Sequence, residues 1–237
     1  MSLQRRPQLT KMWCNPIEKP QNMAFMTLAD TKPDQGSKFH WLFLPGQRPT
    51  TALYDNFIEE TQNFAVLPTK GSIVPGWVLV VPKFPMPRMA DVPQSMYDEL
   101  RELVSYITSK IEAKFGTTYT FEHGGLKGSP VSCGVDQAHL HIAPVNFDLL
   151  EVAQAETAGG WVQTGADRVP QGDCADSEYW FVSSGEAAAY KAIDCPSSQF
   201  FRKIIARETG NADHWDYRDN DFIDNVSVTL KAIGANG

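Results

Sequence analysis

Short apolar runs along the middle of the chain predict a set of strands. Residues 64–67 are all apolar and end at Pro68. Residues 77–81 form a continuous apolar run rich in β-branched side chains after a Pro-Gly turn signal, a pattern typical of a strand buried on both faces. Three further strands are predicted at 118–121, 137–143 and 178–182.

Three segments predict helices. In the clearest one, residues 94–114, apolar side chains recur every three or four positions and so share one face; they are Met96, Leu100, Leu103, Val104, Ile107 and Ile111. A shorter amphipathic pattern covers 200–207 and stops near Gly210, and 226–230 predicts a final helix. Together the strands and helices predict an α+β fold, with an antiparallel sheet flanked by helices.

The spacing of these elements divides the chain into four parts. Prolines punctuate residues 1–39, which we interpret as an irregular N-terminal arm, and residues 40–147 hold the main domain. Residues 148–177 are dominated by small and polar side chains with little periodicity, so we expect an insertion or a connection there. Residues 178–237 are expected to form a C-terminal α+β extension that packs on the main domain.

Composition limits the classes of partner. The 237 residues include 21 Lys and Arg and 28 Asp and Glu, for a net charge of −7. We therefore expect no bulk nucleic-acid or membrane-surface binding, whereas a small phosphorylated ligand can still occupy a local site. No apolar run approaches the roughly 18 residues of a membrane span, and we see no signal peptide. The four cysteines lack a Cys-x-x-Cys pair, which argues against a zinc ribbon and predicts free thiols in the cytoplasm.

The segment most informative about chemistry is residues 133–144. If it is a strand, alternation places Gln137, His139 and His141 on one face, directly after a glycine-rich loop at 122–136. One hypothesis is a metal site in which His139 and His141 are two of the ligands. A cupin-like site would also require a carboxylate a few residues later, and residues 142–150 contain only Asp148. The other is nucleophilic catalysis, in which a neutral imidazole attacks phosphorus or an acyl centre and loop N–H groups approach a phosphate.

Several segments together resemble the histidine triad (HIT) superfamily. Residues 137–142 resemble its motif of histidines alternating with apolar residues, and 64–68 with 74–83 resemble its paired strands. The resemblance spans about residues 40–147, and 200–218 are similar to the C-terminal extension of some larger members. It implies a HIT-like fold and a nucleotide-binding hydrolase or transferase that splits phosphoanhydride, phosphoramidate or nucleotide-sugar bonds at the α-phosphate.

The resemblance also implies roles for particular residues. His139 takes the place of the nucleophile that becomes nucleotidylated, His141 would hydrogen-bond the phosphate or bridging oxygen, and the main-chain carbonyl of Gln137 would orient His139. The residues expected to bind phosphate or nucleotide are His123, Gly124, Ser132, Cys133 and Gly134. The candidate substrate contacts are Leu67, Trp77, Gln199 and Arg202, the last two reaching the site from the C-terminal extension.

Three positions depart from the family pattern. Gln137 replaces the first histidine of the motif and cannot exchange a proton near neutral pH. Trp77 replaces the histidine of the family's usual Pro-Gly-His sequence. Glu122 stands where many members carry Asn, and a carboxylate there would repel phosphate unless His123 or Lys127 paired with it. These changes indicate a divergent substrate or weakened catalysis.

Three hypotheses for function follow. The first is an enzyme that works through a nucleotidyl-His139 intermediate and requires no cofactor, with Mg²⁺ accompanying a polyphosphate substrate. The second is a HIT-fold module that binds a nucleotide without useful turnover. The third is a metal hydrolase that uses His123, His139 and His141. The base, sugar and leaving group stay open, as do hydrolase against transferase and whether the chain forms a homodimer.

Overall fold

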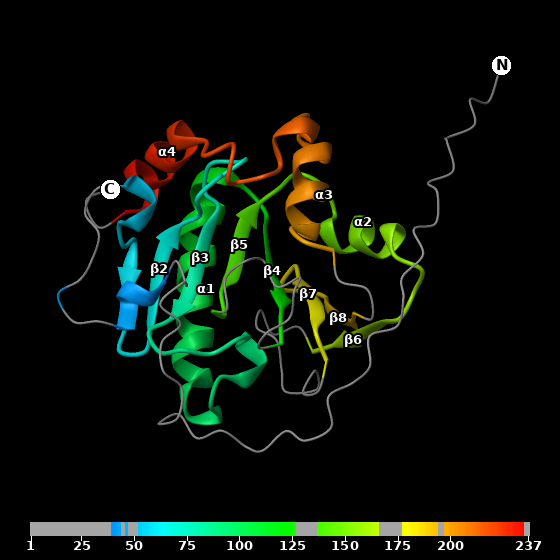
Figure 1. The fold of residues 1–237 in the computed structure, drawn as a ribbon, viewed down its shortest axis with the longest axis horizontal. Coiled ribbons are helices and arrows are strands. Elements are labelled where there is room, and N and C mark those ends of the chain that lie inside the picture. The colour runs from blue at the N-terminus through cyan, green and yellow to red at the C-terminus, as the bar shows by residue number, and fades with distance from the viewer. Residues whose placement is uncertain are drawn as a thin grey trace.

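The computed structural model describes residues 39–43, 46, 52–126, 137–165, 177–193 and 197–234. Within them, eight strands form one sheet in the order β1-β2-β3-β5-β4-β7-β8-β6, and every neighbouring pair is antiparallel (Figure 1). The strands are β1 (Glu59–Glu60), β2 (Phe64–Pro68), β3 (Val78–Pro82), β4 (Thr118–Gly124), β5 (Leu140–Pro144), β6 (Trp161–Thr164), β7 (Tyr179–Ser183) and β8 (Ala188–Ala192). The helices are α1 (Tyr97–Phe115), α2 (Leu149–Glu156), α3 (Phe200–Glu208) and α4 (Ile223–Ile233). The predicted α+β class with an antiparallel sheet is confirmed.

Helices cover both faces of the sheet. Helix α1 lies against one face of the central strands (Figure 1). Its apolar stripe, which includes Leu100, Val104 and Ile107, packs there against alternate side chains of the strands. On the other face a second apolar cluster joins β4 and β7 to α2 and α3 through residues such as Trp180 and Phe201. No helix in the described part of the chain is long and apolar enough to cross a membrane.

The strand predicted at 137–143 begins three residues later, at Leu140. The Ala138 amide donates to the carbonyl of Met86 instead of joining the ladder, and the Gln137 side chain is bound to the same segment. These two residues therefore leave the sheet before β5 starts. The long helix is close to its prediction, since α1 covers 97–115, and both shorter predicted helices are present as α3 and α4.

Residues 148–177 contain regular structure that the sequence pattern did not predict. Asp148 caps α2 by accepting a hydrogen bond from the Glu151 amide, and β6 forms the edge of the sheet next to β8. Strand β8 was also missed. Both strands are short and partly exposed, so little apolar alternation marks them, and pairing with neighbours defines them instead. Residues 166–176 and the N-terminal arm up to residue 38 lie outside the described residues.

The C-terminal extension continues the main sheet and holds the connection between β2 and β3. Strand β7 pairs with β4, so the sheet is continuous. From α4, Asn225 donates to the carbonyls of Ser72 and Ile73, and the Thr229 hydroxyl accepts from the Gly76 amide. The extension therefore positions the turn that leads into Trp77 and β3.

Candidate active site

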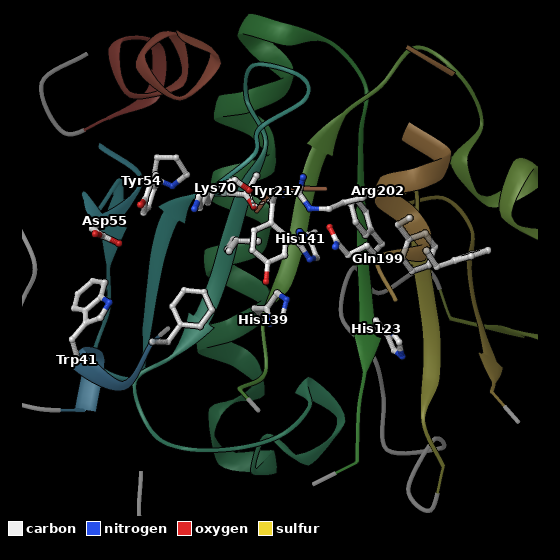
Figure 2. A pocket seen from close by; sticks show the side chains of 17 residues that line it. Trp41, Tyr54, Asp55, Lys70, His123, His139, His141, Gln199, Arg202 and Tyr217 are labelled. Atoms are coloured by element: carbon white, nitrogen blue, oxygen red, sulfur yellow. Dashed lines mark hydrogen bonds between the residues drawn. The ribbon is translucent and has the colours of Figure 1, made fainter. Parts of the chain in front are cut away.

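A cavity of about 330 Å³ opens on the sheet face opposite α1 (Figure 2). Its wall combines the segment before β1, the turn after β2, the strands β3, β4 and β5, and α3 with the loop that follows it. The lining residues are Phe39, Trp41, Tyr54, Asp55, Pro68, Thr69, Lys70, Leu79, Phe121, His123, His139, His141, Gln199, Phe200, Phe201, Arg202 and Tyr217. The cavity thus gathers side chains from segments that are far apart in the sequence.

His139 is held by a hydrogen bond to the main chain. Its Nδ1 lies 2.8 Å from the carbonyl oxygen of Gln137, as the resemblance implied. Because a carbonyl oxygen can only accept, Nδ1 carries the proton and the lone pair of the neutral ring resides on Nε2. The ring centroids of His139 and His141 are 5.0 Å apart, so the two imidazoles are neighbours within the cavity.

His141 lies within β5, between Leu79 of β3 and Phe121 of β4. Its ring stacks on that of Phe121 with 4.8 Å between centroids, and its Nδ1 lies 3.0 Å from Nε1 of Trp77. Burial, together with electrostatic repulsion from His139 when it is protonated and from Arg202, holds the pKa of His141 well below its usual value. The ring is therefore neutral at physiological pH.

Gln137 does not share the cavity face with the two histidines. Its buried amide donates to the carbonyls of Pro82 and Phe84 at 3.2 and 3.0 Å, and its side-chain oxygen accepts from the Met86 amide at 3.3 Å. The side chain thus ties the segment after β3 to the start of β5. The prediction that Gln137 shares a strand face with His139 and His141 is wrong, because β5 begins only at Leu140. The main-chain carbonyl of Gln137 nevertheless contacts His139.

Two of the candidate substrate contacts lie behind the cavity wall. Leu67 is buried in a small apolar cluster with Ala65, Leu79 and Val81, and Trp77 is fully buried against Phe121. Neither lines the cavity. Trp77 acts on the site through its hydrogen bond to His141.

The two candidates from the extension do line the cavity. Arg202 donates hydrogen bonds to the carbonyls of Lys70 and Gly71 and to the hydroxyl of Thr69, and its guanidinium lies 4.6 Å from the ring centroid of Trp77. Gln199 donates to a carboxylate oxygen of Asp216 at 3.2 Å. Arg202 therefore shapes the wall by holding the turn after β2.

The glycine-rich loop is only partly described. His123 lines the cavity, and its Nε2 lies 3.7 Å from a carboxylate oxygen of Glu178. Gly124 packs against Tyr179 so closely that an added Cβ would lie 2.2 Å from the ring, so packing requires glycine there. Ser132, Cys133 and Gly134 lie outside the described residues. In the described part of the chain, no group of three or more His, Cys, Asp or Glu side chains is placed to hold a metal ion.

Glu122 faces away from the cavity. Since His123 on β4 points into the cavity, Glu122 points to the opposite face, where it accepts hydrogen bonds from the Met89 amide and the Tyr179 hydroxyl. Glu122 therefore does not face a phosphate in the cavity. Its hydrogen bonds come from Met89 and Tyr179, His123 interacts with it only through charge, and Lys127 lies outside the described residues. Burial raises the pKa of Glu122 to about 7.

Sequence reasoning missed part of the wall. Phe39, Trp41, Tyr54, Asp55 and Lys70 line the cavity from segments that carry no motif. Tyr217 also lines the cavity. It belongs to a Trp-Asp-Tyr-Arg segment that resembles the extension of larger HIT proteins, and among the missed residues only Tyr217 had such a sequence signal.

Residues 50–147 match the family model of the HIT domain. This range includes His123, His139 and His141, the three histidines that line the cavity. This part of the chain is therefore similar to the HIT domain. No curated protein matches the chain.

Solved structures of HIT-like proteins also resemble it. A hypothetical histidine triad nucleotide-binding protein from Sulfolobus tokodaii is 23% identical with a TM-score of 0.33, over 39% of this chain and 62% of that one. A Hit-like protein involved in cell-cycle regulation from Bartonella henselae is 20% identical with a TM-score of 0.32, over 37% of this chain and 65% of that one. The matches thus span less than two thirds of either relative.

Proposed function

We propose that this protein is a nucleotide-binding HIT enzyme that acts at the α-phosphate of a nucleotide conjugate through a covalent intermediate on Nε2 of His139. The observation that carries the proposal is the 2.8 Å hydrogen bond between Nδ1 of His139 and the Gln137 carbonyl. This bond places the proton on Nδ1 and the nucleophilic lone pair on Nε2, inside a cavity large enough for a small ligand.

In the first step Nε2 of His139 attacks the α-phosphorus. The N–P bond forms, and the bond to the leaving oxygen breaks with its electron pair going to that oxygen. Nδ1 keeps its proton, so the ring becomes positively charged, and the Gln137 carbonyl stabilises this charge. In the second step the oxygen of water or of an acceptor attacks phosphorus, the electron pair of the N–P bond returns to Nε2, and the incoming oxygen loses a proton to solvent. Water gives a hydrolase and another acceptor a transferase.

The cavity has two chemically different ends around the histidines (Figure 2). Trp41, Tyr54 and Asp55 lie at one end, with aromatic rings for stacking and a carboxylate that can accept hydrogen bonds from sugar hydroxyls. Gln199 and Arg202 lie at the other. We assign the nucleoside to the aromatic end and the leaving group to the end formed by the extension.

No cofactor takes part in these steps. Mg²⁺ enters the proposal only with a polyphosphate substrate, whose charge it would reduce. We place the activity in the cytoplasm on a small-molecule nucleotide, without nucleic acid or membrane as a partner. A homodimer is compatible with the proposal but is not required, because every group used in it comes from one chain.

A second candidate function is nucleotide binding without useful turnover. The residue that favours it is Gln137. Its side-chain amide is hydrogen-bonded to main-chain groups of Pro82, Phe84 and Met86, so it supplies no titratable group for catalysis in the cavity. A module of this kind would keep the cavity and lose the chemistry.

Intact-mass spectrometry during turnover separates the two. The protein is mixed with dinucleoside polyphosphates, nucleoside phosphoramidates and nucleotide sugars, and is quenched under conditions that preserve phosphoramidates. We expect a nucleotide-sized mass increase on the wild type, none on His139→Ala, and an unchanged adduct on His214→Ala, whose side chain is exposed on the extension. Ligands that raise the melting temperature without adduct or product would support the binding module instead. An adduct that persists in His139→Ala would refute the assignment of the nucleophile.

A further inference from the structure

Trp77 contacts His141 with the only polar atom of its side chain. Its indole Nε1 lies 3.0 Å from Nδ1 of His141, although the two residues are 64 positions apart. An indole N–H can donate a hydrogen bond and cannot accept one. Nδ1 of His141 must therefore accept, and the proton of the neutral imidazole is placed on Nε2.

The indole ring has no room to turn away from this bond. It is fully buried, the Phe121 ring meets it at an angle of 64° with 5.6 Å between centroids, and the Arg202 guanidinium lies over it at 4.6 Å. Arg202 is itself held by its hydrogen bonds to the turn after β2. The orientation of Trp77 is thus set by the packing of α3 against the sheet.

The surroundings of His141 oppose its protonation. An imidazolium would carry an N–H at Nδ1, which would then face the indole N–H as a second donor. Among the described residues, the titratable and charged groups that act on the ring are His139, just before its own strand, and Arg202 from α3. Arg202 is positively charged, and His139 would add a second positive charge if it were protonated. The neighbouring strands present Leu79 and Phe121, which carry no charge.

We propose that Trp77 is a positioning residue that holds His141 as a neutral imidazole with its proton on Nε2, so that the site selects nucleotide conjugates whose leaving group departs as a stable anion. Phosphoanhydrides meet this condition and phosphoramidates do not. The first half of this statement concerns the protein alone, and the second half rests on the proposed function.

The selection follows from where the proton must go. When a phosphoanhydride is cleaved, the P–O bond breaks and the departing phosphate carries the electron pair as a stable anion, which a hydrogen bond from Nε2–H of His141 stabilises. When a phosphoramidate is cleaved, the pair goes to nitrogen, which must gain a proton to leave as an amine. Neutral His141 can supply that proton only by becoming an imidazolate anion, and the Gln137 amide is not an acid near neutral pH.

Nitrogen NMR of the histidine side chains tests the first half without any substrate. Protein labelled with ¹⁵N in its five histidines is titrated from about pH 5 to 8, with the His141 signals assigned through a His141→Gln sample. We expect the Nε2–H form of His141 throughout, with no protonation. Replacing Trp77 by benzothienylalanine, which has sulfur in place of the indole N–H and nearly the same shape, should give a mixture of the two neutral tautomers, because burial and the nearby cation still oppose protonation.

A comparison of leaving groups tests the second half. The wild type is given matched substrates that carry one nucleotide as a phosphoanhydride and as a phosphoramidate. We expect the phosphoramidate to react at least roughly a hundredfold more slowly than the phosphoanhydride. General acid catalysis contributes about this factor, and neutral His141 cannot provide it for a nitrogen leaving group. In the benzothienylalanine protein the phosphoanhydride should react roughly two- to tenfold more slowly, because part of the His141 population then has no proton on Nε2 to donate to the leaving oxygen.

The two experiments fail in different ways. An Nδ1–H tautomer or a protonated His141 in the wild type, or an unchanged His141 after the Trp77 replacement, overturns the role of Trp77 whatever the activity. Equal rates on the two substrates overturn the selection even if the NMR result holds. If neither substrate reacts or forms an adduct, the proposed function fails together with the selection, and the NMR result still decides the role of Trp77.

Discussion

The buried carboxyl of Glu122 should make the protein less stable as the pH rises through neutrality. The side chain is 1% exposed, on the sheet face opposite the cavity, and its oxygens accept from the Met89 amide at 2.8 Å and from the Tyr179 hydroxyl. These hydrogen bonds favour the ionised carboxylate, but desolvation by burial outweighs them and raises the pKa to about 7. Glu122→Gln removes the charge and keeps an acceptor for the Met89 amide.

The size and sign follow from proton linkage. The pKa of Glu122 rises from 4.5 in the unfolded chain to about 7 in the folded protein, so between these values the folded state binds more protons than the unfolded state. The stability contributed by the protonated group is fully present below about pH 4.5 and is lost as the pH rises through about 7. At about 1.4 kcal/mol for each pH unit, the loss is about 3 kcal/mol.

The assay is urea denaturation of the wild type and Glu122→Gln between about pH 4.5 and 8, with the free energy of unfolding extrapolated to water. The difference between the two proteins cancels the pH dependence of all other groups. As the pH rises, we expect the free energy of unfolding of Glu122→Gln to increase by about 3 kcal/mol relative to that of the wild type. Glu102→Gln on the exposed side of α1 is the matched control and should show no trend. If the difference for Glu122→Gln stays constant over this range, Glu122 does not have a raised pKa in the folded protein.

Three further predictions concern the elements around the cavity. Gly76→Ala should lower the free energy of unfolding by about 2–3 kcal/mol, because its φ is +87° and the new Cβ would lie 2.7 Å from the Phe115 ring; a smaller loss in urea denaturation would contradict the tight packing. Asp148→Ala should cost about 1 kcal/mol by removing the cap of α2, measured as a fall of a few degrees in melting temperature that Asp148→Asn does not show. Arg202→Lys keeps the charge and loses the forked hydrogen bonds, so we expect urea denaturation to show a loss of about 3 kcal/mol; stability equal to the wild type would mean that the turn after β2 holds without Arg202.

Much of the central sheet could be predicted from local patterns. Strand β2, strand β3 and helix α1 each bury a face through a periodicity written in consecutive residues, so their predicted positions agree with the structure to within a few residues. Strands β6 and β8 could not be predicted in this way. Their side chains are partly exposed, and what makes them strands is hydrogen bonding to each other and to β7.

The candidate site divides along the same line. Alternation within a strand is a property of the backbone, and it was sufficient to predict that His139 and His141 share one face, which lines the cavity. The hydrogen bond between His139 and the Gln137 carbonyl was implied by the family resemblance. Alternation failed for the Gln137 side chain and could not give Glu122 its partner, because both outcomes depend on which distant backbone groups and hydroxyls lie nearby.

The class of fold and the shared face of the two histidines could therefore be predicted from local periodicity, and the HIT-like core from the family resemblance. Only the tertiary structure decided which residues complete the cavity wall, among them Asp55, Lys70 and Tyr217, and which nitrogen of His141 carries its proton. The reason is physical. Contacts between Trp77 and His141, or between Arg202 and the turn after β2, arise from the packing of segments more than 60 residues apart, as the separations of 64 and 131–133 residues show.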